Sequence, residues 1–283
     1  MNTSVTPSIT AGDPAEYQRQ MERVSAFAPR VHIDIADGTM SPVHLTSIDE
    51  IWWPGTVRAD IHVMYKRPLE HLPALIALQP QLIIVHAEGE GSYFEFAEAC
   101  HHHGIETGIA LLQTTPVEQI KGGLDLIDHV LVFSGDLGHF GGKANPALLS
   151  KVKLLKQLKP QLEIGWDGGV NLQNAAALAK AGVEVLNTGG YIQQADDPQS
   201  AYEELMAKAN SFASAPAPTA PASAPSPATE AQASAPEVAE PQAPTEHHDL
   251  PMSRPISVLT SRTADRGRGA TGIPVRRLNV EQR

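Results

Sequence analysis

Short apolar runs rich in Val, Ile and Leu alternate with longer segments of helical period from residue 1 to about residue 212. The alternation repeats about eight times, which is typical of parallel strands joined by crossover helices. The pattern predicts strands at 5–9, 31–35, 59–63, 82–86, 107–111, 129–133, 162–166 and 184–188. Apolar residues at intervals of three and four predict helices at 14–27, 92–103, 145–158 and 171–181.

Eight such units predict the α/β class and a (β/α)8 TIM barrel over residues 1–212. An open, doubly wound sheet is the alternative. That fold normally carries a GxGxxG turn after its first strand, and the segment PSITAGD does not have this pattern.

The composition supports a folded core, because 42% of residues are apolar, although only 5% are aromatic. No run of about 18 apolar residues is present, and the first residues lack the features of a secretory signal. We therefore expect a cytoplasmic protein. The single cysteine, Cys100, has no partner for a zinc or redox motif and is expected to be a small buried residue. Any metal must be held by histidine and carboxylate.

The net charge of −11 argues against nucleic acid or a membrane surface as the main partner. A small anionic substrate is still compatible with it, since backbone N–H groups and a metal ion supply positive potential locally.

The composition changes near Phe212. Residues 213–251 are rich in Ala, Pro, Ser and Glu, which predicts a disordered linker. Residues 252–283 carry seven arginines against two acidic residues, which predicts a basic, disordered C-terminal segment. A docking peptide for an unknown partner is the functional interpretation of this tail, and a solvated end is the other.

Sets of mostly polar residues recur two positions apart on three of the predicted strands, so on each strand they share one side, which faces the barrel mouth. The three sets are His32 and Asp34; Asp60, His62 and Met64; and Glu163, Gly165 and Asp167.

Four of these side chains are expected to converge as two imidazoles and two carboxylates: His32, Asp34, His62 and Asp167. A lone strand histidine is usually a core residue, but four such groups at one level would be costly to bury unpaired. A shared cation removes that cost. Two nitrogen and two oxygen ligands suit zinc, iron(II), manganese or cobalt better than magnesium or calcium.

From about Ser4 to Phe212, the chain that carries these residues resembles the ribulose-phosphate 3-epimerases. The resemblance rests on motifs in the family's order: PSITAGD, HIDIADG, DIHVM, VHAE, FGGK, WDGGV and TGG.

The resemblance implies a TIM barrel and a metal on the four residues named above, with Asp34 and Asp167 as the two acid/base groups. It also implies that Ser8, His62 and Met64 contact the substrate. Epimerisation beside a ketone needs a carboxyl group on each side of the carbon, and a metal stabilises the enediolate between the two proton transfers.

The substrate phosphate is expected to be held by backbone N–H groups after the sixth, seventh and eighth strands, where this fold usually binds phosphate. Three glycine pairs occur there: Gly141 and Gly142, Gly168 and Gly169, and Gly189 and Gly190.

The sequence departs from the family in the sixth loop, which is GDLGHFGGK where the family usually has Asn-Pro-Gly-Phe-Gly-Gly-Gln. Ala36 replaces the usual methionine and Gly190 the usual serine. His86 and Glu88 match the family's fourth-strand motif, and the sequence leaves open whether they support the metal or only pack. The triplet 101–103 is interpreted as surface histidines.

We expect a sugar-phosphate 3-epimerase that interconverts D-ribulose 5-phosphate and D-xylulose 5-phosphate. An epimerase for a six-carbon ketose phosphate is one alternative, and a non-catalytic barrel acting as a binding or scaffold module is the other. Whether the chain forms homo-oligomers is left open.

Overall fold

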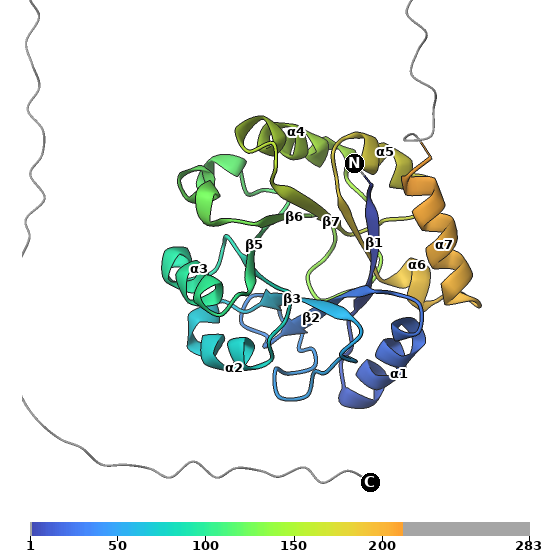
Figure 1. Cartoon of the computed structure of the whole chain (residues 1–283), viewed down its shortest axis with the longest axis horizontal. Helices are drawn as coiled ribbons and strands as arrows, with labels where there is room; N and C mark the ends of the chain where they lie inside the picture. Colours follow the sequence, from blue (N-terminus) through green and yellow to red (C-terminus); the bar gives the residue numbers. More distant parts are fainter. Residues whose placement is uncertain (1, 212–283) are drawn as a thin grey trace, which may run out of the picture. The chain divides into compact units, whose positions relative to one another are not determined.

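The computed structural model describes residues 2–211. Within this range eight parallel strands, β1 to β8, pair in sequence order, and β8 closes the barrel against β1 (Figure 1). The strands are β1 Ser4–Ile9, β2 Arg30–Ala36, β3 Arg58–Met64, β4 Leu82–His86, β5 Glu106–Leu111, β6 His129–Phe133, β7 Glu163–Asp167 and β8 Val185–Thr188. The predicted TIM barrel is confirmed.

Helices surround the barrel and bury one face against it (Figure 1). The α-helices are α1 Pro14–Ser25, α2 Leu72–Ala77, α3 Tyr93–His102, α4 Leu149–Leu158, α5 Ala175–Lys180, α6 Gly190–Gln193 and α7 Pro198–Ala209. Short 3-10 turns are η1 Pro68–His71, η2 Val117–Gln119, η3 Lys121–Leu126 and η4 Pro146–Leu148.

The sequence sets where the longer helices begin. The Asp13 side chain accepts a hydrogen bond from the backbone of Glu16, which caps α1, and Ser92 caps α3 through Glu95 in the same way. Because a capped N-terminus fixes where the helix starts, each preceding loop is held at the end of its strand.

Two connections differ from the regular strand and helix alternation. The segment between β2 and β3 contains no helix, and the segment between β5 and β6 contains only the 3-10 turns η2 and η3. Pro42 and Pro54 interrupt the first segment, and the pair Gly122 and Gly123 disfavours an α-helix in the second.

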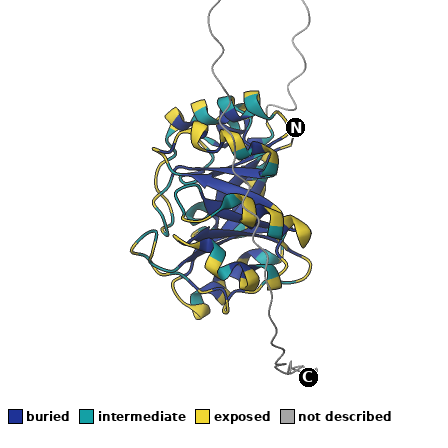
Figure 2. Cartoon of the chain, turned by 90° about the vertical axis from the view of Figure 1, so that its left-hand side faces the viewer, coloured by how far each residue is buried: buried dark blue, intermediate teal, exposed yellow. Residues whose placement is uncertain are grey.

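Most of the apolar core lies between the strands and the helices, whereas the barrel interior contains a small apolar cluster. Figure 2 shows the strands as mainly buried and the exposed residues on the surrounding helices and loops. That cluster consists of Leu82, Ile84, Ala110 and Leu131. The rest of the interior is unusually polar, and it divides into two levels along the barrel axis.

The lower level lies near the start of the strands and is centred on Arg30. Its Nε donates to both carboxylate oxygens of Asp60 at 3.0 and 2.8 Å, and its two terminal nitrogens donate to Glu163 at 3.0 Å each. His129 Nδ1 lies 2.7 Å from the second oxygen of Glu163. Gly165 makes room for this histidine, since a Cβ there would lie 2.5 Å from His129 Nε2.

This arrangement corrects one expectation. Asp60 and Glu163 share the inward side of their strands with His62 and Asp167, but they pair with Arg30 at the lower level instead of reaching the mouth. Asp60 comes two residues before His62 and Glu163 four before Asp167, so each lies further down its strand.

The predicted linker at 213–251 and the basic segment at 252–283 lie outside the described residues. Among residues 2–211, no helix is both long and apolar enough to cross a membrane. Cys100 is fully buried, as expected, and the histidines at 101–103 are exposed.

Candidate active site and metal centre

The upper level of the barrel interior brings together the four predicted ligands. Strand pairing places Asp34 of β2 opposite His62 of β3, and His32 lies one inward position below Asp34. Asp167 ends β7 on the far side of the barrel. One ligand atom from each of the four residues lies within 4.8 Å of all the others.

The shortest distances centre on the carboxylates. His62 Nδ1 lies 2.8 Å from Asp34 Oδ1 and 4.0 Å from Asp167 Oδ2. His32 Nε2 lies 3.3 Å from Asp34 Oδ1 and 3.7 Å from Asp167 Oδ2. Both imidazoles are fully buried, and each has a nitrogen within 4.0 Å of both carboxylates.

The donor set fits a divalent cation. His32 is completely buried, yet neither of its ring nitrogens makes a well-aligned hydrogen bond within residues 2–211, although Nε2 lies 3.3 Å from Asp34 Oδ1. A buried polar group without a partner costs free energy of about 1–3 kcal/mol. An ion held by two nitrogens and two carboxylate oxygens satisfies His32 and separates the two carboxylates, which favours zinc or a similar transition metal.

The two carboxyl groups have different electrostatic surroundings. Burial by itself raises the pKa of Asp34, but the adjacent imidazoles of His32 and His62 outweigh it and hold the pKa well below its usual range. Burial and the nearby charge of Asp34 raise the pKa of Asp167 to about 7.

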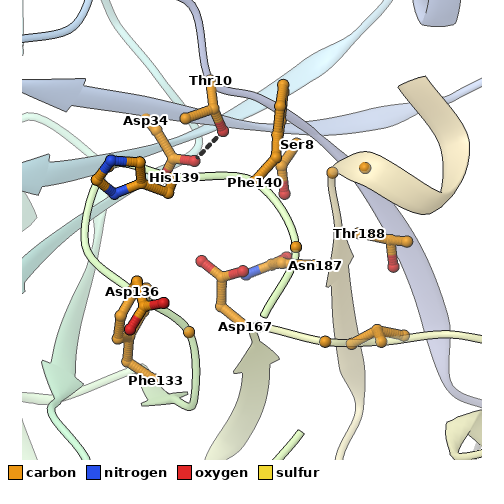
Figure 3. A pocket seen from close by; sticks show the side chains of 18 of the residues that line it. Ser8, Thr10, Asp34, Phe133, Asp136, His139, Phe140, Asp167, Asn187 and Thr188 are labelled. Carbon is orange, nitrogen blue, oxygen red and sulfur yellow. Dashed lines mark hydrogen bonds between the residues drawn. The ribbon is translucent and has the colours of Figure 1, made fainter. Parts of the chain in front are cut away.

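Thr10 is a site residue that the sequence analysis missed. Its hydroxyl donates to Asp34 Oδ2 at 2.6 Å, so Asp34 keeps Oδ1 for the two imidazoles (Figure 3). The signal was present, because Thr10 follows Ser8 by two residues and so shares its side of the chain.

A pocket opens above the four candidate ligands and is lined by residues of β1, β2, β3, β6, β7 and β8 (Figure 3). Of the predicted site residues, it is lined by Ser8, Asp34, Met64, Gly141, Asp167, Gly168, Gly169, Gly189 and Gly190. His32, His62 and Gly142 are not part of its wall.

Other lining residues were not identified from the sequence: Phe133, Asp136, His139, Phe140, Asn187, Thr188 and Tyr191. Asn187 is the clearest case, since it pairs with Asp167 in the strand register and both polar atoms of its amide lack a partner among the described residues. A polar residue inside the apolar run of β8 was the signal for it.

The glycines of the mouth also permit close loop packing. Gly168 has a φ of +105°, and a Cβ there would lie 2.1 Å from the backbone nitrogen of Gly135. Gly169 has a φ of +71° and would meet Ala144 in the same way. At these two positions a side chain is excluded by both conformation and space, so the sixth and seventh loops can approach each other over the pocket.

A model described as the ribulose-phosphate 3 epimerase family matches residues 4–193. The chain belongs to this family. The resemblance found in the sequence is thereby confirmed, and so is the expectation of an isomerase of the epimerase class that acts on carbohydrates.

Relatives agree with the assignment. The ribulose-phosphate 3-epimerase of Helicobacter pylori (strain J99) is 32% identical over 71% of this chain and 95% of its own length. The enzyme of the same name from Schizosaccharomyces pombe is 27% identical over 72% of this chain and 93% of its own length.

Solved structures share the fold at low identity. KGPDC from Streptococcus mutans has a TM-score of 0.56 at 10% identity and covers 75% of this chain and 99% of its own. The 3-hexulose-6-phosphate synthase from Salmonella typhimurium has a TM-score of 0.53 at 13% identity, with 74% and 99% covered.

Proposed function

We propose that this chain is a metal-dependent 3-epimerase that interconverts D-ribulose 5-phosphate and D-xylulose 5-phosphate. The observation that supports this most strongly is the pocket where Asp34 of β2 and Asp167 of β7 meet above two buried imidazoles. Family membership supports the substrate class, since the relatives carry the name of this reaction.

Two carboxyl groups are what the reaction needs, because one proton leaves one face of C3 and another is delivered to the opposite face. We assign these transfers to Asp34 and Asp167. One carboxylate takes the C3 proton, and the electron pair of the broken C–H bond gives the enediolate. The other carboxyl group, already protonated, returns its proton to C3. The two groups thus exchange protonation states in each turnover.

The different surroundings of the two aspartates support this assignment. The Thr10 hydroxyl donates to the Asp34 carboxylate, whereas the Asp167 carboxyl group accepts no hydrogen bond from a side chain among residues 2–211 and faces the charge of Asp34. A pair with one ionised and one protonated member can begin turnover in either direction of the reaction.

We assign the cation site to the four residues His32, Asp34, His62 and Asp167, with zinc, iron(II), manganese or cobalt as the candidate ions. When bound, such an ion supplies positive charge that stabilises the negative charge developing on the substrate oxygens. The chain's own part is to hold the carboxylates in place and to exclude water, which the complete burial of the two histidines supports.

The rest of the substrate is assigned to the remainder of the pocket. We place the phosphate against the backbone N–H groups near Gly141, Gly169 and Gly189, and the sugar beside Ser8 and Met64, with His62 below them. The Ser8 hydroxyl has no partner among residues 2–211 and is buried, so it is available to a substrate hydroxyl. Gly142 stays a prediction, since it is not part of the wall.

Proton exchange at C3 tests this function. The metal-loaded protein is mixed with D-ribulose 5-phosphate in deuterated water, and the C3 proton is followed by NMR. We expect deuterium at C3 together with formation of D-xylulose 5-phosphate, and neither with the Asp167→Asn variant. A folded, metal-loaded wild type that gives no exchange would leave the scaffold interpretation instead.

The sixth loop supports a second candidate. Asp136 and His139 line the pocket in a loop that departs from the family pattern, which favours a different substrate length. Parallel assays with five- and six-carbon ketose phosphates separate the two, since the preferred substrate has the higher kcat/KM. The cytoplasmic location stays a prediction, and homo-oligomer formation and a partner for the C-terminal segment stay open, as in the sequence analysis.

A further inference from the structure

A chain of hydrogen bonds leads away from the candidate metal centre towards the outside of the barrel. His62 Nε2, the nitrogen turned away from the aspartates, lies 2.8 Å from Nε2 of His86 on β4. His86 Nδ1 lies 3.2 Å from Glu88 Oε2. Both histidines are buried, so neither contact has water as a ready substitute.

Glu88 fixes the direction of this chain. Its other oxygen, Oε1, accepts from the backbone N–H of Leu112 at 3.1 Å and from the hydroxyl of Thr115. Burial raises the pKa of Glu88, but hydrogen bonds from His86, Thr115 and Leu112 outweigh this effect and lower the pKa to about 2. An ionised carboxylate only accepts, and therefore Nδ1 of His86 must carry a hydrogen.

The direction then passes to His62. A neutral His86 with its hydrogen on Nδ1 has a bare Nε2, which accepts from His62 Nε2–H. Nδ1 of His62 is left with its lone pair facing Asp34 Oδ1 at 2.8 Å. A lone pair and a carboxylate at that distance repel unless a positive charge lies between them, so this tautomer is the one a metal ligand needs.

The opposite direction creates a conflict elsewhere. If His62 donated from Nδ1 to Asp34, His86 would donate from Nε2 to His62 and would present a bare Nδ1 to the Glu88 carboxylate at 3.2 Å. The two hydrogen bonds that hold Glu88 as an acceptor leave it no hydrogen to give. The arrangement with a cation beside His62 is free of this conflict.

We propose that His86 and Glu88 are positioning residues that hold His62 in the Nε2–H tautomer and thereby set the affinity of the metal centre. This inference rests on the proposed function, because it assumes a cation at the four ligands. Partners of this kind behind metal-bound histidines typically change metal affinity 10–100-fold when they are removed.

Glu88→Gln is the sharpest variant. The Leu112 N–H still needs an acceptor, so the amide oxygen stays there and the amide NH2 faces His86. His86 then accepts at Nδ1, donates from Nε2, and forces the hydrogen of His62 onto the nitrogen that faces the metal. Glu88→Ala removes the acceptor for His86 Nδ1–H but does not reverse the direction of the hydrogen bonds, because His86 can then adopt either tautomer.

The two variants should therefore differ in metal affinity, and in the opposite order to the one expected from lost packing alone. We expect Glu88→Gln to weaken metal binding by about 10–100-fold, and the smaller, more disruptive Glu88→Ala to weaken it less. His86→Phe, which keeps a ring beside Phe133 but loses the chain, should also weaken it, and His86→Gln should restore part of the loss.

The measurement is competition between the cobalt-loaded or zinc-loaded protein and a chelator of known affinity, with the visible spectrum of bound cobalt as a second readout. His101→Gln is the matched control, because His101 pairs with Asp128 at 2.7 Å at the opposite end of β5. Its metal affinity and cobalt spectrum should equal those of the wild type.

The outcomes separate the two claims. If folded Glu88→Gln retains wild-type affinity and spectrum, or binds metal better than Glu88→Ala, the positioning inference is overturned while the proposed function stands. If the wild type binds no metal, both are overturned. Glu88 is partly exposed, so its variants can be measured even if a change at buried His86 prevents folding.

Discussion

Replacing Arg30 tests whether the lower polar level holds the strands that carry the candidate site. Arg30, Asp60 and Glu163 come from β2, β3 and β7, and the same three strands supply all four candidate ligands. Arg30→Met keeps an unbranched apolar stem but removes the guanidinium group, with its five N–H donors and the positive charge.

The structure sets the size of the effect. Asp60 is 1% exposed, and Arg30 makes two hydrogen bonds to it. Breaking a buried ion pair from one side costs about 3–5 kcal/mol, because the remaining charge is left without compensation. For a domain of this size that corresponds to a fall in Tm of about 6–20 °C, at roughly 2–4 °C per kcal/mol.

Chemical denaturation followed by circular dichroism, with a parallel thermal scan, measures this change. Arg67→Met is the control, since Arg67 pairs with Glu70 on the surface with both side chains more than half exposed. An exposed pair of this kind contributes at most about 1 kcal/mol. If Arg30→Met costs no more than Arg67→Met, the lower level does not hold the strands together.

Three further predictions concern the site residue Thr10, the pH dependence of stability and the C-terminal segment. Thr10→Val removes the hydroxyl that donates to Asp34, and a hydrogen bond to a charged group contributes about 1.5–3 kcal/mol. We therefore expect steady-state kinetics to show a fall in kcat/KM of roughly 10–100-fold. An unchanged kcat/KM would show that Thr10 has no part in the site. The pKa of Glu163 is held below its ordinary value of 4.5, because hydrogen bonds from His129 and Arg30 outweigh the effect of burial; its contribution to stability is therefore complete above about pH 4.5 and is lost as the pH falls further. Urea unfolding between pH 3 and 6 should show a weaker acid dependence for Glu163→Gln than for the wild type, and parallel curves would contradict this. A chain ending at Phe212 should have a kcat/KM within about twofold of the full-length value, because the residues that line the pocket lie between Ser8 and Tyr191. A large loss of kcat/KM would show that residues after Phe212 take part in catalysis.

The barrel and the four converging residues were predictable from local pattern. Strand ends fell within one residue of the observed ones, since buried parallel strands produce apolar runs that turn signals delimit. The two-residue spacing of His32 and Asp34 fixed a common side, and closure of the barrel then brought distant strands to one point.

Other features depend on register and on loops, which local pattern does not encode. Arg30 reaches Glu163 across 133 positions of sequence, and nothing near either residue indicates the other. Asp60 was expected at the mouth because spacing gives the side of a strand but not the depth at which a side chain finds its partner. The contacts of Thr10 and Asn187 likewise became visible only once the strands were paired.

The activity proposed for this chain is metal-dependent proton exchange at C3 of a ketose phosphate. The most direct measurement is the rate of deuterium incorporation at C3 of D-ribulose 5-phosphate by one protein sample as purified, after metal removal, and after reloading with zinc or cobalt. The account predicts exchange that is lost with the metal and recovered on reloading. Exchange at the full rate in a sample shown by elemental analysis to be free of metal would contradict it.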